Sequence, residues 1–467
     1  MPVEGKNFRK KMSVNKKTLV FMMLCLLIVP AFLSLADRIC NAENYTWTGR
    51  SGSDWSDSTN WRPEGQLGSA DKAIIPGGVV SQPKITDYVS IGELSIENNA
   101  SLMIDTPSGG LQIFGNALIN GNLTFSKGSF RSSGCTIAEN GIVTISGDAI
   151  FELGMDKICS ISSRGILNLY GGFVSFDYNA ILENNGLIVW SGCEIRPLVG
   201  NSCILNNNGE MNIRTGGIKK LIACVLTNNG IINLSDTVTV SSSADITNNS
   251  VLNWTAGGFV VQSLLPPSPP PSPFIFKNNK EITMNGTDSK SVAYCVFINE
   301  ATGSIDFAPE SILSVSGDDK SRFDNKGVIK GNGVLEFSFP SPDIPMPPLK
   351  NSGTIRPGGD NQTGKFTIKG KYKQTEEGIL EIKIKNQNEY DSLILNGDIA
   401  FNGVLEVKLL DGATVSGTDI YHVVTYTGTH SGSFSSVNLP KFPGYKFDTV
   451  EYISGPSGVV EIPVVKK

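Results

Sequence analysis

Histidine is almost absent from this chain of 467 residues. Only His422 and His430 occur, and both lie towards the C-terminal end. No Cys-x-x-Cys pair is present, so the ligand spacing typical of zinc sites is missing. The catalytic motifs G-x-S-x-G and H-E-x-x-H and the phosphate-binding loop motif are missing too. The sequence therefore predicts neither a metal site nor a bound cofactor.

Charge and helical patterning are also scarce. Charged residues make up only 18% of the chain, and long amphipathic helical patterns are absent. Glycine, in contrast, occurs 50 times. This balance argues against a helical bundle and favours a chain of short strands and tight corners.

A short phrase recurs about every 20 to 24 residues through much of the chain. It reads Asn-Gly, or a close variant, followed by apolar residues two and four positions later. Clear copies are ENGIVTI (139–145), NNGLIVW (184–190), NNGEMNI (207–213), NNGIINL (228–234) and NNSVLNW (248–254). A fixed repeat of this length predicts a solenoid in which each repeat forms one coil.

The apolar positions within each repeat alternate with a period of two, as in Ile188 and Trp190, which indicates strands rather than helices. The repeat is too short for a crossover helix. We therefore expect an all-β fold, a right-handed parallel β-helix of about 11–12 coils with a cap at each end. Trp190 and Trp254 share one apolar column with leucine and isoleucine, so both are expected to be buried.

Four segments follow from this reading. They are a signal peptide at 1–42, a Trp-rich cap at 43–95, the parallel β-helix at 96–384 and a C-terminal cap of amphipathic strands at 385–467. Proline-rich stretches at 264–275 and 339–348 interrupt the repeat at the same corner of the coil. Since proline cannot donate to a strand ladder, we expect projecting loops there. The alternative is a pair of polyproline ligands for a partner protein.

The first 42 residues have the features of an export signal. Four lysines between Lys10 and Lys17 precede an apolar run from Leu19 to Leu35. Cleavage after Ala42 or Ala36 would release the chain, whereas a retained signal anchor is the alternative. Cleavage after Ala42 would leave 32 basic and 42 acidic residues, a net charge of −10. We therefore expect a secreted or cell-envelope protein with no nucleic-acid partner and no membrane span in the mature chain.

Cysteines recur at one phase of the repeat. Cys135, Cys159, Cys203 and Cys224 each lie six residues before the glycine position, where other coils carry Ala180 and Ala244. The sequence predicts that these cysteines point inward in a single line, as buried thiols in the core. The alternative is a disulfide between adjacent coils, Cys135–Cys159 or Cys203–Cys224.

Paired asparagines mark one corner of the coil, at 184–185, 207–208, 228–229 and 248–249. Asparagine tolerates a left-handed backbone, and its side-chain amide can bond to the identical amide one coil away. The adjacent glycine fits a tight turn. We therefore interpret this corner as structural rather than as a calcium site, because neighbouring carboxylates are mostly missing.

Two regions resemble families of exported bacterial proteins. The stretch YTWTGRSGSDWSDSTNWRPEG (45–65) is similar to the opening module of large exported β-solenoid proteins. Its residues Trp47, Trp55 and Trp61 are expected to close the end of the core, with stacking on sugars as the alternative.

The second region runs from SGTIRPGG (352–359) through YDSLILNG (390–397) and GVLEVKLLDG (403–412) to GSFSSVNLP (432–440). It resembles the end of the passenger domains of autotransporters and related surface proteins. That resemblance implies a right-handed β-helix finished by amphipathic strands. Unlike true autotransporters, the sequence has no segment for the translocating membrane barrel, so self-export is not expected.

Outward-facing positions give little support for catalysis. The column three residues after the glycine position reads Thr144, Asn168, Val189, Asn212, Asn233, Asn253, Thr283, without a pair of carboxylates. The candidate ligand-binding residues are Asn168, Asn212, Asn233 and Asn253. We expect a non-enzymatic protein with a structural, adhesive or surface-display role, whose partners are extracellular glycans, other envelope proteins or further copies of the chain. The alternative is a carbohydrate-active β-helix enzyme or a glycan-binding module.

Overall fold

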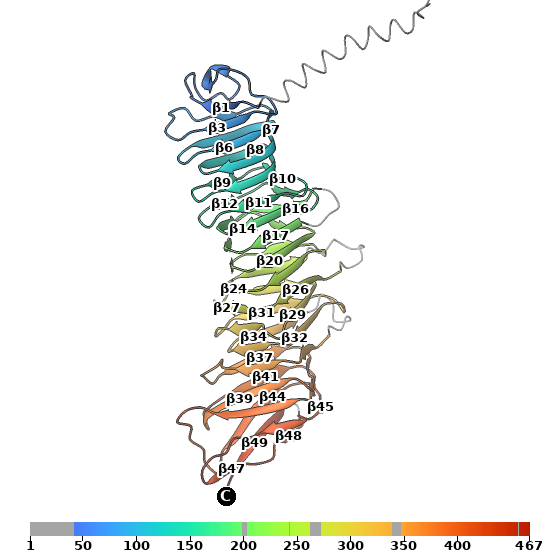
Figure 1. Ribbon diagram of the computed structural model, residues 1–467. Coiled ribbons are helices and arrows are strands. Elements are labelled where there is room, and N and C mark those ends of the chain that lie inside the picture. The colour runs from blue at the N-terminus through green and yellow to red at the C-terminus, as the bar shows by residue number, and fades with distance from the viewer. Residues whose placement is uncertain (1–41, 199–202, 242, 262–271, 339–346, 456) are drawn as a thin grey trace, which may run out of the picture.

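A computed structural model describes residues 42–198, 203–241, 243–261, 272–338, 347–455 and 457–467. The predicted signal peptide at 1–42 lies outside these ranges except for its last residue. Most of the proline-rich stretches at 264–275 and 339–348 lies outside them too. The described chain forms one long column, with its N-terminal coils and its C-terminus at opposite ends (Figure 1).

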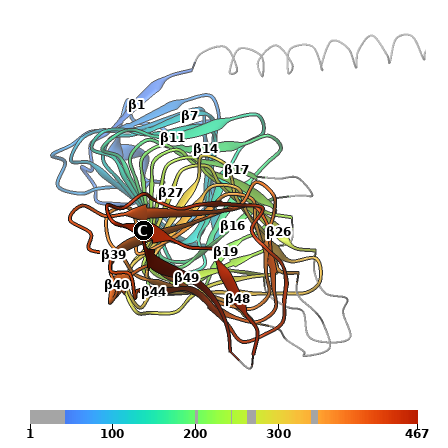
Figure 2. The same cartoon turned by 90° about the horizontal axis from the view of Figure 1, so that it is seen from below.

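The chain is an all-β parallel solenoid, as predicted, but it has about 14 turns instead of 11–12. The difference arises because the parallel ladders continue into segments assigned to the caps, at 72–96 and 392–432. Each coil passes through three faces, and the coils stack along one axis (Figure 2). The boundaries of the predicted segments stay predictions.

The first face of each coil follows the asparagine corner and carries the recurring apolar phrase. Its strands pair in parallel and in register, so that Leu167 lies between Val143 and Ile188. The face contains the first parts of β7 (Ser101–Ile119) and β8 (Asn122–Ile137). Its other strands are β4 (Lys84–Ile85), β9 (Ile142–Ile145), β12 (Ile166–Leu169), β15 (Leu187–Trp190), β18 (Glu210–Ile213), β21 (Ile231–Leu234), β24 (Val251–Trp254), β27 (Glu281–Met284), β30 (Ser304–Phe307), β33 (Val328–Gly331), β36 (Thr354–Pro357), β39 (Ile379–Asn386), β43 (Val404–Leu409) and β46 (Ser436–Asn438).

The second face follows the next corner and includes the middle parts of β7 and β8. Here Phe151 lies between Phe130 and Val174. The remaining strands of this face are β5 (Val89–Ile91), β10 (Ile150–Leu153), β13 (Phe173–Phe176), β16 (Cys193–Pro197), β19 (Lys219–Leu221), β22 (Val238–Val240), β25 (Gly257–Val261), β28 (Lys290–Ala293), β31 (Ile312–Ser316), β34 (Val334–Ser338), β37 (Lys365–Lys369), β41 (Ser392–Asn396) and β44 (Ile420–Tyr426).

The third face closes each coil and ends at the asparagine corner. It includes the last parts of β7 and β8, and Leu205 lies between Leu182 and Leu226. The remaining strands are β1 (Asn44–Trp47), β3 (Lys72–Ile75), β6 (Glu93–Ile96), β11 (Ile158–Ile161), β14 (Ile181–Asn184), β17 (Cys203–Asn207), β20 (Cys224–Asn228), β23 (Asp245–Asn248), β26 (Phe274–Asn278), β29 (Cys295–Asn299), β32 (Arg322–Asn325), β35 (Leu349–Asn351), β38 (Tyr372–Gln374), β42 (Ile399–Phe401) and β45 (His430–Gly432).

Antiparallel strands appear at the two ends of the solenoid. At the N-terminal end, β2 (Trp61–Arg62) follows the short 3-10 helix η1 (Ser58–Asn60) and pairs with β1. At the C-terminal end, β49 (Gly458–Lys466) pairs with β44, β47 (Tyr445–Phe447) and β48 (Glu451–Ile453), while β40 (Glu389–Tyr390) forms a hairpin with β39. Val460 and Ile462 of β49 belong to the buried core.

The three tryptophans near the N-terminus form one buried cluster. The ring centroids of Trp47 and Trp61 lie 5.0 Å apart, and those of Trp55 and Trp61 lie 4.7 Å apart, both edge-to-face. The indole nitrogen of Trp61 donates to the backbone oxygen of Trp55 at 2.9 Å. Because all three side chains are buried, their faces are not open for stacking on a sugar.

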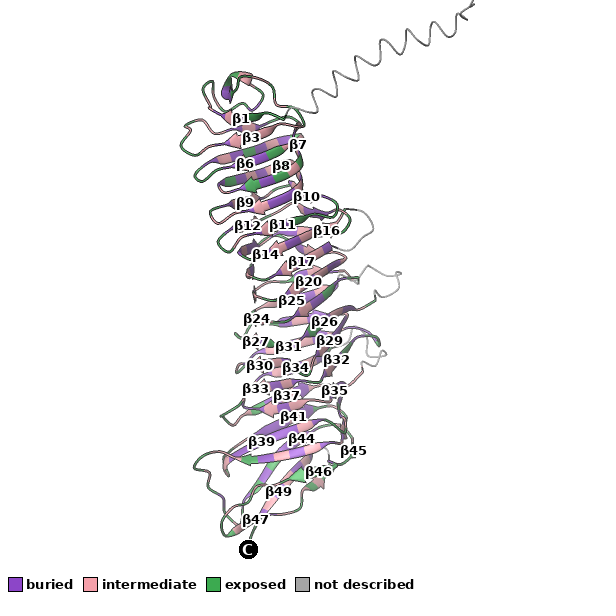
Figure 3. Ribbon diagram, viewed as in Figure 1, coloured by how far each residue is buried: buried purple, intermediate pink, exposed green. Residues whose placement is uncertain are grey.

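Alternating burial runs along the solenoid, with purple and paler positions following one another on the strands (Figure 3). Trp190 and Trp254 are both fully buried, which confirms the inward phase of their column. Farther along, the ring of Phe297 stacks between the rings of Phe276 and Phe323 at centroid distances of 4.7 and 4.4 Å. Period-two alternation therefore sets which side chains enter the core.

A buried asparagine ladder runs down the corner between the third and first faces. Each side-chain amide nitrogen donates to the amide oxygen of the next coil at 2.6 to 2.8 Å, until the last member, Asn351, donates to the Tyr372 hydroxyl at 3.2 Å. We call this set the inner asparagine ladder, and its members are Asn184, Asn207, Asn228, Asn248, Asn278, Asn299, Asn325 and Asn351. The predicted amide stacking is confirmed, and it continues into coils where the Asn-Asn-Gly phrase is no longer recognisable.

An exposed outer ladder lies beside the inner one. Its members bond between coils at 2.7 to 3.2 Å and are Asn185, Asn208, Asn229, Asn249 and Asn279. The outer amides donate towards the N-terminal end, whereas the inner amides donate towards the C-terminal end. The paired asparagines thus supply two antiparallel rows of amide bonds at one corner.

The second predicted reason for asparagine at this corner, a left-handed backbone, is wrong. No member of the inner ladder is among the described non-glycine residues with positive φ, so the corner does not require a left-handed backbone. Glycine is needed for closeness instead. A Cβ at Gly230 would collide with the backbone oxygen of Gly209, and a Cβ at Gly209 would collide with that of Gly186.

The cysteines point inward, as predicted, but they form two columns. Cys135 pairs in register with Cys159, and Cys203 pairs with Cys224, while Cys159 lies beside Leu182 on its other side. The prediction that all four cysteines share one line is therefore wrong, because the column of Cys135 and Cys159 continues to Leu205, two residues after Cys203. The cause is the corner length, because Gly165 lies four positions after Ile161, whereas Gly186 lies only two positions after Asn184.

The redox states of the two cysteine pairs differ. Cys203 and Cys224 form a disulfide between adjacent coils, with Cα atoms 4.5 Å apart. Cys135, Cys159, Cys193 and Cys295 are free and buried. Burial raises the pKa of the Cys193 thiol to about 12, which makes it a poor nucleophile. The favoured prediction of buried thiols thus holds for the first pair, and the disulfide alternative holds for the second.

Candidate functional site

The predicted ligand-binding asparagines lie on the outer side of the first face. Asn212, Asn233 and Asn253 occupy one column on successive coils. Asn168 stands apart from them, because Val189 occupies the intervening coil. The structure therefore brings together three of the four candidate residues.

Much of the hydrogen-bonding capacity of these amides is used within the protein. Asn253 donates to Asn233 at 2.8 Å, and Asn233 donates to Asn212 at 2.8 Å and to Glu210 at 3.1 Å. Asn168 donates to Thr144 at 3.2 Å. A ligand on this column would compete with bonds that already hold the coils together.

The same column becomes strongly charged after Thr283. Asp306, Lys330, Arg356, Glu381 and Glu406 follow one another on successive coils. The neutral column read from the sequence ended at Thr283, so these charged positions lie beyond the prediction. Counting three residues on from Gly303, Gly327 and Gly353 would have revealed the first of them.

Ion pairs connect this charged column. Glu381 Oε2 accepts from Arg356 Nη2 at 3.2 Å and from Lys408 Nζ at 2.8 Å, and Arg356 Nε lies 2.8 Å from Glu381 Oε1. Lys330 lies 3.6 Å from Asp306 and also pairs with Asp360, which in turn contacts Arg356. Burial acts to raise the pKa of Glu381, but Lys408 and Arg356 outweigh it, and the resulting pKa lies below its usual range. Glu381 is thus held as a carboxylate, suited to structural pairing.

A second charged group lies fully inside the same region. Lys383 Nζ is 2.6 Å from Asp391 Oδ2 and donates to the backbone oxygen of Pro357 at 2.7 Å. Asp391 also accepts from the backbone nitrogens of Gly364 and Lys383, each at 2.8 Å. Burial raises the pKa of Asp391 to about 7, although Lys383 acts in the opposite direction. Through these hydrogen bonds, the Lys383–Asp391 pair connects strand β39 to the loop at 357–364.

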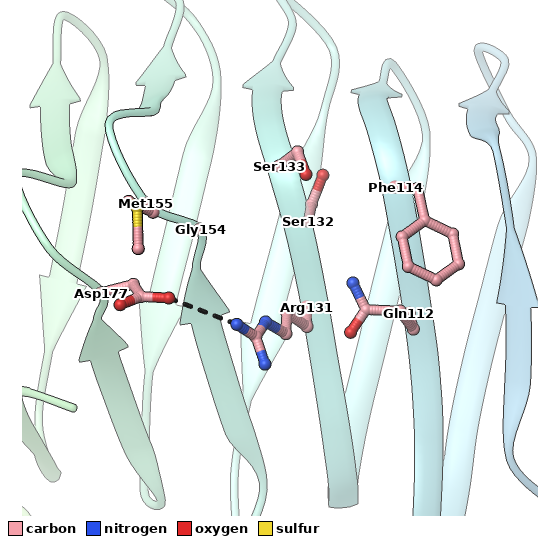
Figure 4. A pocket seen from close by; sticks show the side chains of 8 residues that line it. All are labelled: Gln112, Phe114, Arg131, Ser132, Ser133, Gly154, Met155 and Asp177. Atoms are coloured by element: carbon pink, nitrogen blue, oxygen red, sulfur yellow. Dashed lines mark hydrogen bonds and ion pairs between the residues drawn. The ribbon is translucent and has the colours of Figure 1, made fainter. Parts of the chain in front are cut away.

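A shallow pocket of about 410 Å³ opens on the second face near the N-terminal end. Its lining residues are Gln112, Phe114, Arg131, Ser132, Ser133, Gly154, Met155 and Asp177. Arg131 crosses its floor towards Asp177, with Phe114 and Met155 on opposite sides (Figure 4). Arg131 lies 3.2 Å from Asp177 and 3.6 Å from Glu152.

Sequence reasoning missed this pocket because its residues come from four coils and carry no shared motif. Gln112 and Arg131 are neighbours in register, whereas Asp177 enters from the corner after β13. The outward positions of the second face could have been counted from the sequence. The dip between Phe114 and Met155 could not have been found in this way.

Neither a metal-binding cluster nor a membrane-spanning helix is found in the part of the chain that the structure describes. No group of three or more His, Cys, Asp or Glu side chains there is placed to hold a metal ion. Within the same residues, no helix has the length and apolar character to cross a membrane. Comparison with models of known protein families gave no match, and a search of curated protein sequences gave none either.

Proposed function

We propose that this chain is an exported, non-catalytic β-solenoid with a structural, adhesive or surface-display role. The observation that carries the proposal is the continuous inner asparagine ladder, which links one coil to the next through buried amide bonds. Such a ladder makes the column cooperative along its axis. A stiff column suits a protein that holds surfaces at a distance from one another.

Two further features support export. The segment at 1–42 has the charge and apolar pattern of a signal peptide. The Cys203–Cys224 disulfide would persist in an oxidising compartment, as outside the cytosol. The resemblance to autotransporter passenger domains points to a bacterial cell surface.

The alternative function is a carbohydrate-active enzyme. Its best support is the approach of Glu152 and Asp177 to a single cation, Arg131. Both carboxylates pair with Arg131, whereas glycoside hydrolysis requires one carboxyl group that is free to donate a proton. Incubating the purified chain with a polysaccharide panel separates the two functions. Bond cleavage that is lost on Asp177→Asn would replace the proposal by the enzyme.

Cell fractionation tests the proposed location. Intact cells producing the chain would be labelled with a membrane-impermeant amine reagent, and the modified lysines would be identified by mass spectrometry. Lysines with exposed side chains, such as Lys371 and Lys446, should be labelled in intact cells. Labelling only after lysis, with the chain in the cytoplasmic fraction, would contradict the proposal.

A further inference from the structure

We infer that the pocket on the second face binds a neutral oligosaccharide. This inference rests on the proposed adhesive role, for which it names a site and a ligand class. The volume of the pocket, about 410 Å³, lies within the ordinary range of small-ligand sites, roughly 300 to 1,000 Å³. Its size alone does not choose a ligand, so the argument depends on shape, available hydrogen bonds and charge.

The shape of the pocket comes from a change in side-chain size between coils. Phe114 and Met155 project from the corner that follows the second face, and their exposed fractions are 56% and 55%. Between them the chain has only the small residues Ser132, Ser133 and Gly134. Two apolar walls therefore flank a floor of small residues, which leaves space for a flat ring with an apolar face.

Hydrogen-bonding groups line the side next to these walls. The amide of Gln112 makes a single long contact of 3.5 Å among the described residues, so its oxygen and nitrogen face the pocket with capacity left. Arg131 contacts its acid partners through Nη2 and Nε, which leaves Nη1 to donate. Asp177 supplies acceptors. Adjacent hydroxyl groups of a sugar both donate and accept, so they match this mixed set.

The charge of the site disfavours other ligands. Arg131 is the one cation among the described residues that line the pocket, and it already faces two carboxylates, Asp177 and Glu152. An anionic sugar, a phosphate or a nucleic acid would meet a net negative surface. A neutral sugar loses less solvation energy on binding than a charged one and needs no counter-charge.

The apolar wall also continues along the axis. The backbone nitrogen of Asp156 donates to the backbone oxygen of Tyr178 at 2.8 Å, so the main chain next to Met155 lies beside that of Tyr178 in the neighbouring coil. Tyr178 is 48% exposed. The row from Phe114 through Met155 to Tyr178 can therefore contact more than one ring of an oligosaccharide lying along the solenoid.

Binding would be measured by calorimetry on the purified full chain with soluble cello-, malto-, xylo-, manno- and galacto-oligosaccharides, and with polygalacturonate as the anionic arm. We expect at least one neutral series to bind with little dependence on salt. Phe114→Ala and Gln112→Ala should each weaken that binding roughly tenfold or more. Tyr170→Ala is the matched control, since Tyr170 is 49% exposed and does not line the pocket.

Each outcome is decisive. Loss of binding in Phe114→Ala and Gln112→Ala, with unchanged melting temperatures and normal binding by Tyr170→Ala, supports the site. Failure of every neutral series to bind, binding of polygalacturonate alone, or equal loss in Tyr170→Ala overturns it. Surface labelling of intact cells is independent of this result, so a surface-exposed chain without glycan binding would contradict the pocket and leave the proposed function standing.

Discussion

At the scale of single residues, the solenoid depends on polar groups that are buried and fully paired. The inner-ladder amides from Asn184 to Asn325 each donate to the counterpart one coil away and to a nearby backbone oxygen. Asn228, for example, donates to Asn248 at 2.7 Å and to the backbone oxygen of Val251 at 3.0 Å. A buried amide is costly when it is unpaired and stabilising when it is paired. The ladder therefore selects one register between coils, because any slip would strand its amides.

Removing one ladder amide should test this directly. We expect Asn228→Ala to lower the free energy of unfolding by about 2 to 4 kcal/mol, because it leaves one amide N–H of Asn207 without its acceptor and the amide oxygen of Asn248 without its donor. Asn229→Ala removes the exposed neighbouring amide and should cost less than about 1 kcal/mol. Denaturant titration of both variants gives the comparison, and equal losses would contradict a special role for the inner ladder.

The buried Asp391 should give the chain a pH dependence of known sign. Burial raises its pKa to about 7 in the folded chain, above the value of about 3.9 in an unfolded one. The protonated form is thus favoured by folding, so its contribution to stability is full below about pH 4 and falls as pH rises to about 7. Relative to Asp391→Asn, the wild-type chain should lose stability across that window and change little above it.

Thermal melting from pH 4 to 8 would measure that difference. Glu381 and Asp360 have lowered pKa values, so their contributions are lost on acidification and act in the opposite direction. They are present in both proteins and cancel in the comparison. If the wild-type chain instead gained stability relative to Asp391→Asn as the pH rises, Lys383 would be holding Asp391 in its charged form.

At the scale of elements, each coil is three short strands, and its contacts are almost all with the coils before and after it. This makes links between coils the main determinant of local stability. The Cys203–Cys224 disulfide is such a link between β17 and β20. Cys135 and Cys159 offer a natural comparison, because they are also in register, buried and on adjacent coils, but are not bonded.

Replacing both members of each pair by alanine should separate the covalent link from simple packing. We expect the double variant Cys203→Ala/Cys224→Ala to lower the free energy of unfolding by about 3 kcal/mol more than Cys135→Ala/Cys159→Ala does. The reason is that the disulfide closes a loop with a sequence separation of 21. A reductant should lower the melting temperature of the wild type and of the Cys135/Cys159 variant only. Equal sensitivity of both variants to reductant would mean that the first pair is also bonded.

At the scale of the whole molecule, the chain is a column of stacked units. Residues 209–229 form one complete coil, and joining Asn208 to Gly230 would place Ile231 over Leu187 and Asn248 over Asn207. Every inward column and the inner ladder would then continue across the junction. The deletion also removes Lys219 and Cys224, leaving Asp236 and Cys203 without their partners.

We expect the chain lacking 209–229 to fold, with an unchanged strand signal in circular dichroism and one cooperative melting transition. A shorter deletion of 209–219 should not fold normally, because it joins the third face to the middle of a coil and breaks the alternation of inward and outward residues. If the whole-coil deletion aggregates as readily as the partial one, the coils are not interchangeable units.

The amino-acid sequence alone determined the class of this fold. The recurring phrase and its period-two alternation predicted a parallel β-solenoid, the inward phase of Trp190 and Trp254, and the stacked asparagines at one corner. These features are local, because strand alternation depends on neighbouring residues and each coil repeats the last. For the same reason the number of turns was too low, since the outer coils keep the fold without keeping the phrase.

Only the tertiary structure decided which side chains meet across coils. Corner length varies by two residues, and this placed Cys135 and Cys159 in a different column from Cys203 and Cys224. The tertiary structure also places Gln112, Arg131 and Asp177 around one pocket. It brings Glu381 into contact with Arg356 and Lys408. Such contacts depend on the path of each corner and the reach of long side chains, which the repeat pattern does not record.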